Sequence, residues 1–299
     1  MEEHIIYFFR DIAAPWLDML AKGITMAGED NLIIVLLTWV YWNISKKNGI
    51  ILCYTYLFSV FLNNVLKLVF RTSRPFQVLN GIEGKRLETA TGYSFPSGHT
   101  QSSTTFFLTL YLLFRKRWMI AVMIIIPLLV GISRVYHGVH WPVDIIAGWG
   151  FGIIVSFIAY YFLNKYYETR KTFRFILLLS INFVLIALLA LIWINNSFFD
   201  GNLYLSDTYK IGGIFTGVVL GFLLEENTVI FSVAGTIKIK VIRYFAGVII
   251  TFLLIAGLKK IFPEQNVFHF VRYFITGFWV SFVFPYLGIK LKLFSIEKE

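Results

Sequence analysis

The sequence has 299 residues, of which 58% are hydrophobic, 18% aromatic and only 15% charged, and its mean hydropathy is +0.72. Soluble domains are about 45–50% apolar and about 25% charged, so this composition excludes an ordinary soluble protein and predicts a membrane protein with several spanning helices. The net charge of +10 indicates cytoplasmic loops, anionic lipid and an anionic substrate rather than nucleic acid. Cys53 is the single cysteine and lies in an apolar run, which excludes a disulfide framework and a thiolate metal site.

The N-terminal segment is not typical of a cleaved signal peptide. Glu2 and Glu3 stand where a signal peptide carries positive charge, and Arg10 and Asp11 interrupt the first apolar run. Apolar and charged residues then alternate at helix-like spacing. We therefore expect residues 1–29 to form an amphipathic segment on the bilayer surface.

The rest of the chain contains about nine apolar stretches separated by polar or basic segments. A transmembrane helix needs about 20 apolar residues. The predicted fold is therefore all-α: a polytopic membrane bundle of about nine transmembrane helices that follows the N-terminal amphipathic helix. The predicted spans are 32–42, 50–70, 98–114, 118–135, 142–163, 175–194, 211–224, 242–258 and 268–289.

The distribution of lysine and arginine predicts the orientation of the bundle. Alternating spans place five basic stretches on one side, and the excess of positive charge identifies that side as cytoplasmic. The polar loop 71–97 then faces the other side, and Lys259-Lys260 is the exception to the rule. The five basic stretches are 46–47, 115–117, 165–174, 238–243 and 290–292.

A turn-prone Pro-Ser-Gly-His sequence, Pro96 to His99, joins this loop to the span at 98–114. Proline fixes φ, glycine allows a ligand close to the backbone, and the first N–H groups of the following helix point back at the turn. This is the geometry of an anion site beside an ionisable imidazole. Taken alone, His99 is more typical of a satisfied polar residue than of a catalytic one.

Two further groups of residues flank the turn. Lys67, near the end of the second span, is followed after six residues by Arg74-Pro75, and Ser133-Arg134 is followed by His140 and Asp144. Because Pro142 is suited to open a helix, the Asp144 carboxylate can reach the His140 ring. Lys67 alone would be explained equally well by snorkelling to the headgroups, and Asp144 alone by a charge at a helix start.

Together these residues suit phosphoryl transfer. Lys67, Arg74 and Arg134 can hold phosphate oxygens, and Ser97 and the backbone of Gly98 add donors. His140, oriented by Asp144, can attack phosphorus, and His99 can protonate the departing oxygen and then activate water. His137, His140 and Asp144 could also suggest a metal site, but three nearby cations would repel a divalent ion, so no metal is expected.

The three motifs, Lys-x6-Arg-Pro, Pro-Ser-Gly-His and Ser-Arg-x5-His-x3-Asp, resemble the signature of the type 2 phosphatidic-acid phosphatase superfamily, with every named position filled. The resemblance covers about residues 30–165. It implies metal-independent hydrolysis of a phosphate ester or diphosphate through a phosphohistidine, without a cofactor. In it, His140 is the nucleophile, Asp144 its partner and His99 the acid, while Lys67, Arg74, Ser97, Gly98 and Arg134 bind phosphate.

The resemblance also implies a division of the chain. We expect an interfacial segment at 1–29, a five-span phosphatase core at 30–170 and an extension of about four spans at 171–299. Gly213, Gly217 and Gly221 recur every four residues in the extension, which predicts close helix packing. The extension could also wall a lipid entry route or form a homodimer face.

The expected protein is thus a lipid phosphatase in a bacterial plasma membrane, with its active site on the extracytoplasmic side. Its substrate is expected to be a prenyl diphosphate such as undecaprenyl diphosphate, or a phospholipid such as phosphatidic acid or phosphatidylglycerol phosphate. A phosphotransferase to a lipid or sugar hydroxyl and a phosphatase of soluble esters remain alternatives, as does a transporter or scaffold with a degenerate pocket. The loop cations Arg71, Lys85 and Arg86 are interpreted as headgroup contacts or solvated charges.

Overall fold

The computed structural model describes residues 1–297, and helices make up most of that range. The two short strands, β1 (Phe231–Ser232) and β2 (Ser295–Ile296), pair antiparallel. The α-helices are α1 (Glu2–Asp11), α2 (Pro15–Thr25), α3 (Asp30–Trp39), α4 (Lys46–Phe70), α5 (Pro75–Val78), α6 (Gly98–Phe114), α7 (Trp118–Tyr136), α8 (Pro142–Tyr166), α9 (Arg170–Phe198), α10 (Ser206–Thr228), α11 (Ile237–Ile261), α12 (Asn266–Phe278) and α13 (Phe284–Lys290). Single turns of 3₁₀-helix, η1 (Met26–Gly28) and η3 (Leu87–Thr89), and of π-helix, η2 (Val40–Ile44) and η4 (Trp279–Val283), complete the chain.

Seven helical segments in residues 1–297 are long and apolar enough to cross a membrane, or eight if the bent pair Pro15–Gly28 and Asp30–Ile44 forms one span. The prediction of a polytopic all-α membrane protein is confirmed, although the expected count of nine was approximate. Two predicted spans are not among the seven: 32–42, which is part of the bent pair, and 98–114, which is α6, a helix of 17 residues rich in Ser and Thr and largely buried. A helix surrounded by protein does not need an apolar face toward lipid.

The chain forms two compact units. The first comprises Met1–Ile34 and Leu62–Tyr161, and the second comprises Val35–Phe61 and the chain from Phe162 onward. Three helices are therefore shared, because α3 leaves the first unit after Ile34, α4 enters it at Leu62 and α8 leaves it after Tyr161.

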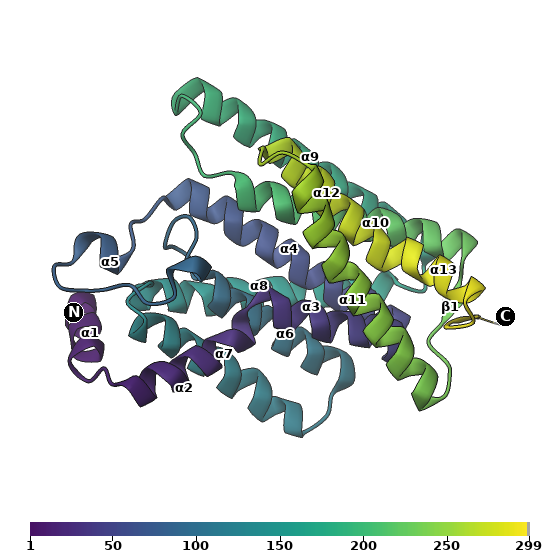
Figure 1. The fold of residues 1–299 in the computed structure, drawn as a ribbon, viewed down its shortest axis with the longest axis horizontal. Helices are drawn as coiled ribbons and strands as arrows, with labels where there is room; N and C mark the ends of the chain where they lie inside the picture. Colours follow the sequence, from purple (N-terminus) through teal and green to yellow (C-terminus); the bar gives the residue numbers. More distant parts are fainter. Residues whose placement is uncertain (298–299) are drawn as a thin grey trace. The chain divides into compact units, whose positions relative to one another are not determined.

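In the first unit, α6 packs against α7, and α1 and α2 of the N-terminal segment also pack against α7 (Figure 1). Ile6 of α1 is buried in a cluster with Ile82, Val135 and Ile145. Gly148 of α8 faces the start of α6: a Cβ atom at Gly148 would lie 2.9 Å from the carbonyl oxygen of Ser97. The absence of that side chain lets α8 approach the Pro-Ser-Gly-His turn.

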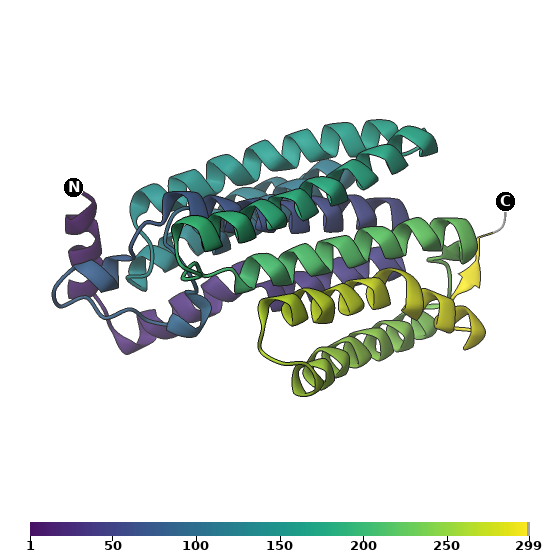
Figure 2. The same ribbon diagram turned by 90° about the horizontal axis from the view of Figure 1, so that it is seen from above.

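In the second unit, α10 packs against α9 and α12 (Figure 2). Gly213 and Gly217 of α10 face the backbone of Phe270 and Phe274 in α12, too closely to leave room for a side chain. The four-residue glycine spacing therefore serves close helix packing, as predicted. Arg243 is completely buried in this unit and donates to Asn43 Oδ1 at 2.9 Å.

Candidate active site

The Pro-Ser-Gly-His turn is fixed by hydrogen bonds at both ends. The backbone N–H of Ser97 donates to the carbonyl oxygen of Asp144 at 3.0 Å, which joins the turn to the first residues of α8. The Ser97 hydroxyl lies 2.9 Å from Thr100 Oγ1, and the side chain of Asn63 donates to the carbonyl of Pro96 at 3.3 Å. Because α6 begins at Gly98, the turn presents helical N–H groups at its N-terminus, where an anion is stabilised.

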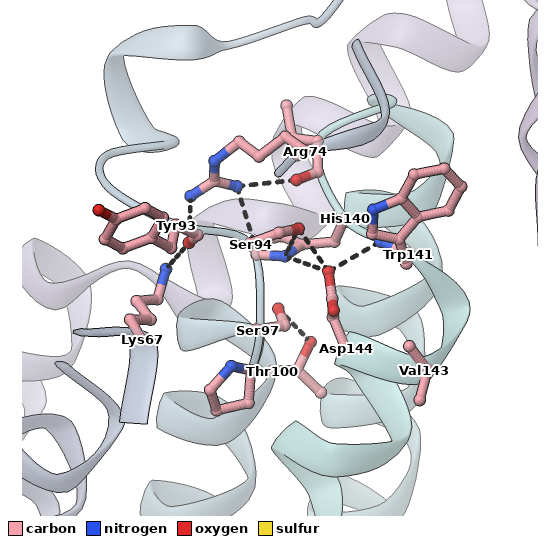
Figure 3. Close-up of polar contacts among 12 residues, drawn as sticks. Lys67, Arg74, Tyr93, Ser94, Ser97, Thr100, His140, Trp141, Val143 and Asp144 are labelled. Atoms are coloured by element: carbon pink, nitrogen blue, oxygen red, sulfur yellow. Dashed lines mark hydrogen bonds and ion pairs between the residues drawn. The ribbon is translucent and has the colours of Figure 1, made fainter. Parts of the chain in front are cut away.

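His140 and Asp144 are in direct contact, as their four-residue spacing predicted. Nδ1 of His140 lies 3.1 Å from Oδ2 of Asp144, and both side chains are almost completely buried (Figure 3). The same carboxylate oxygen accepts a hydrogen bond from the Ser94 hydroxyl at 2.5 Å and from the Trp141 backbone N–H at 2.9 Å. Three donors thus converge on one oxygen, and the ring of His140 has a fixed orientation.

Arg74 faces the other ring nitrogen of His140. Its Nη1 lies 3.2 Å from His140 Nε2 and donates to the Val139 carbonyl at 2.7 Å, while Nη2 donates to the carbonyl of Tyr93 at 3.2 Å. Lys67 donates to that same carbonyl at 2.8 Å, so the two cations meet beside His140 (Figure 3). Lys67, Arg74 and His140 belong to motifs that are separate in the sequence, and in the structure their side chains lie together as predicted.

Arg134 and His99 have buried nitrogen atoms without a hydrogen-bond partner in residues 1–297. Arg134 is completely buried, and its Nη1 donates to the hydroxyls of Thr25 at 3.3 Å and Thr89 at 3.2 Å. Its Nε and Nη2 remain unpaired, as does Nε2 of His99. Unpaired buried donors are costly, which is consistent with a site for an acceptor-rich anion.

Burial and positive charge keep the histidines of this loop neutral. Desolvation, and after it the charge of Arg74, holds the pKa of His140 well below its ordinary value. Desolvation, and after it the charge of Arg134, lowers the pKa of His137 to about 4. In a neutral His140 ring, a proton on Nδ1 suits Asp144, and the lone pair on Nε2 then faces Arg74.

The loop between α5 and α6 is held by ion pairs to the N-terminal segment. Lys85 Nζ lies 2.5 Å from Asp18 Oδ1, and Arg86 Nη1 lies 2.6 Å from Glu29 Oε1. The interpretation of Lys85 and Arg86 as headgroup contacts or solvated charges was therefore wrong. Both find carboxylates on α2 or just after it, because this segment packs beside the loop.

Sequence analysis did not identify the polar residues that orient the site. Ser94 holds Asp144, and Thr25 and Thr89 hold Arg134. Ser94 stands two residues before Pro96, and that proximity is the one signal available in the sequence. In residues 1–297 no three His, Cys, Asp or Glu side chains gather as a metal-binding group would.

Comparison with known proteins gives two family matches. Residues 48–168 match the family model described as PAP2 superfamily, and residues 209–298 match the one described as PAP2 superfamily phosphatase, transmembrane extension. The first match contains every predicted catalytic and phosphate-binding residue, and the second lies in the C-terminal helices.

Three curated relatives illustrate the similarity. An undecaprenyl-diphosphatase of Sulfolobus acidocaldarius is 42% identical over 118 residues, which cover 38% of this chain and 55% of the relative. Phosphatidylglycerophosphatase B of Bacillus subtilis is 28% identical over 173 residues, which cover 54% of this chain and 82% of the relative. A protein of Escherichia coli with a provisional undecaprenyl-diphosphatase name is 30% identical over 146 residues, 48% of this chain and 71% of the relative.

Proposed function

This chain belongs to the PAP2 superfamily, and from that premise we propose that it is a membrane lipid phosphatase that works through a phosphohistidine on His140. The observation that carries the proposal is the pair of contacts made by the His140 ring. Nδ1 lies 3.1 Å from Asp144, and Nε2 lies 3.2 Å from the guanidinium of Arg74. A phosphate held by Arg74 would therefore lie next to the lone pair that attacks it.

The first chemical step forms a bond between His140 Nε2 and phosphorus and breaks the bond from phosphorus to the ester or diphosphate oxygen. His99, which carries a proton on both ring nitrogens at the start of this step, donates one of them to that departing oxygen and becomes neutral. Asp144 accepts from Nδ1–H and stabilises the positive charge that develops on the ring. In the second step water attacks phosphorus, gives a proton to His99, and releases inorganic phosphate and neutral His140.

Phosphate binding is assigned to Lys67, Arg74, Ser97, Gly98 and Arg134. Buried Nε and Nη2 atoms of Arg134 have no partner in residues 1–297, so they are available to phosphate oxygens. The N-terminus of α6 adds backbone donors. Phosphoryl transfer requires chiefly positioning and neutralisation of oxygen charge, and this set supplies both.

The proposed substrate is a lipid phosphate or a prenyl diphosphate. Two relatives are named for activity on undecaprenyl diphosphate, one of them provisionally, and a third for activity on phosphatidylglycerol phosphate. We place the site on the extracytoplasmic side of a bacterial plasma membrane, because the basic stretches mark the opposite side as cytoplasmic. Within this proposal, residues 1–29 are interfacial, 30–170 form the phosphatase core and 171–299 form the extension.

Phosphate release by the purified protein in excess EDTA tests the proposal. The panel contains undecaprenyl diphosphate, phosphatidic acid, phosphatidylglycerol phosphate and, as a soluble ester, glucose 6-phosphate. We expect release from at least one lipid, unaffected by EDTA and lost in His140→Ala. Loss of activity in EDTA that added metal restores, or full activity in the variant, would refute the mechanism.

A further inference from the structure

A second positively charged pocket lies in the C-terminal extension, apart from the residues assigned to catalysis. It encloses about 120 Å³ where the first turns of α10 and α12 meet the last turn of α11. These helix ends lie at the same end of the second unit (Figure 2). The polar residues that line it are Lys210, Lys259, Glu264, His269, Arg272 and Thr276.

Arg272 forms the floor of this pocket. It is 5% exposed, and its Nε has no hydrogen-bond partner in residues 1–297. Its Nη2 contacts Nδ1 of His269, and its two Nη atoms lie 3.5 Å from the oxygens of Glu264. A buried guanidinium with one unsatisfied N–H and two long contacts has unused capacity for an acceptor.

The lining carries more positive than negative charge. Lys259 and Arg272 line the pocket with the carboxylate of Glu264, whose side chain is 59% exposed, while Lys210 pairs with Asp207 at 2.8 Å. Glu264 lies in the loop between α11 and α12, and its pairs with Arg272 and His269 measure 3.5–3.6 Å. Exposed ion pairs of this length contribute little to stability. An anion with more charge than a carboxylate, such as phosphate, can therefore displace Glu264 from Arg272.

The position of Lys259 also requires an explanation. Lys259-Lys260 is the basic stretch that breaks the charge rule, since the proposed orientation places it on the extracytoplasmic side. Because Lys259 lines the same pocket as the buried Arg272, its charge can serve ligand binding in that pocket and need not reflect the orientation of the protein. Basic pockets between transmembrane helices are typical sites for anionic headgroups.

We propose that this pocket, formed by Lys210, Lys259 and Arg272, binds a phosphate group, either on a membrane lipid or as the free ion. Its volume of about 120 Å³ is several times the 10–15 Å³ that one water molecule needs, so a phosphate fits. Arg272 offers its Nε and an Nη atom as a fork for two oxygens, and Lys259, together with Lys210 where it turns from Asp207, neutralises the remaining charge.

The test uses full-length protein that carries Arg74→Gln, so that binding at the active site is weakened. One arm measures labelled inorganic phosphate by equilibrium dialysis. The other measures retention of phosphatidylglycerol from mixed micelles by native mass spectrometry. Each arm compares Lys259→Gln and Arg272→Gln with Lys260→Gln, which removes the neighbouring exposed lysine that does not line the pocket.

We expect Arg272→Gln to weaken binding by about tenfold or more, and Lys259→Gln by about threefold, with Lys260→Gln unchanged. An effect in the dialysis arm alone identifies free phosphate, and an effect in the lipid arm identifies a headgroup. If Arg272→Gln does not fold, Lys259→Gln decides, because its side chain is exposed. Equal binding by Lys259→Gln and Lys260→Gln in both arms would overturn the proposal, whatever the result for His140.

Discussion

Replacement of Asp144 by asparagine separates the charge of this residue from its position. Oδ2 of Asp144 accepts from Ser94, His140 and Trp141, while Oδ1 is buried without a partner in residues 1–297. Three donors at one oxygen would repel an amide NH₂ group. The asparagine should therefore place its carbonyl oxygen there and keep all three hydrogen bonds.

What Asp144→Asn removes is the negative charge behind the His140 ring. A hydrogen bond to a charged group is worth about 1.5–3 kcal/mol and a neutral one about 0.5–1.5 kcal/mol. The bond from His140 strengthens as the ring becomes positive, so we expect a loss of about 1–2 kcal/mol in the transition state. This corresponds to a rate about 5–30 times lower.

Asp144→Ala is the matched comparison. It leaves the Ser94, His140 and Trp141 donors without their acceptor at a buried site, at about 1–3 kcal/mol each. We expect a rate more than about 100 times lower and a reduced Tm. Single-turnover phosphate release and thermal unfolding in detergent measure both variants. Equal rates for Asn and Ala, or a wild-type rate for Asn, would refute this reasoning.

Three further predictions concern the turn and the loop histidines. In a single turnover, His99→Ala should slow release of the alcohol from an alkyl lipid phosphate far more than release of p-nitrophenol from p-nitrophenyl phosphate, whose leaving group needs no proton; an equal loss would contradict the role of an acid. Gly148→Ala places a Cβ 2.9 Å from the Ser97 carbonyl and should cost about 1–3 kcal/mol, whereas Gly150→Ala, with nothing within 4 Å, should leave the Tm unchanged or higher. Folding lowers the pKa of His137 to about 4, so between pH 6.5 and pH 4 the unfolded chain binds a proton that the folded chain does not. The free energy of unfolding should therefore decrease over this range as the pH falls, by up to about 3 kcal/mol. The decrease in Tm over this range should be smaller in His137→Gln, and an equal decrease would count against the burial of a neutral ring.

Motif spacing predicted the contacts that depend on a few consecutive residues. His140 and Asp144 stand four apart across the start of α8, and their atoms lie 3.1 Å apart. Gly213 and Gly217 stand four apart on α10, and both face α12. The α10 helix fixes the positions of the two glycines, and the short segment that leads into α8 fixes those of His140 and Asp144, so the sequence contains the geometry.

Contacts that depend on the path of a loop could not be predicted in this way. Arg134 meets Thr25, which is 109 residues earlier in the chain, and Arg86 meets Glu29. Both contacts exist because the N-terminal segment packs against α7 beside the loop before α6. No local pattern specifies that packing, and Lys85 and Arg86 were therefore misassigned to headgroups or solvent.

The central claim is that His140 carries the phosphoryl group during turnover. The most direct measurement mixes His99→Ala protein in EDTA with ³²P-labelled p-nitrophenyl phosphate, whose leaving group needs no proton from His99. The reaction is quenched in alkali, where phosphohistidine survives, and the labelled peptide is then identified. In this variant water activation is slowed, so label should accumulate on the peptide that contains His140 and be absent from His140→Ala. Label on another residue, or phosphate release without any labelled protein in pre-steady-state samples, would contradict the mechanism.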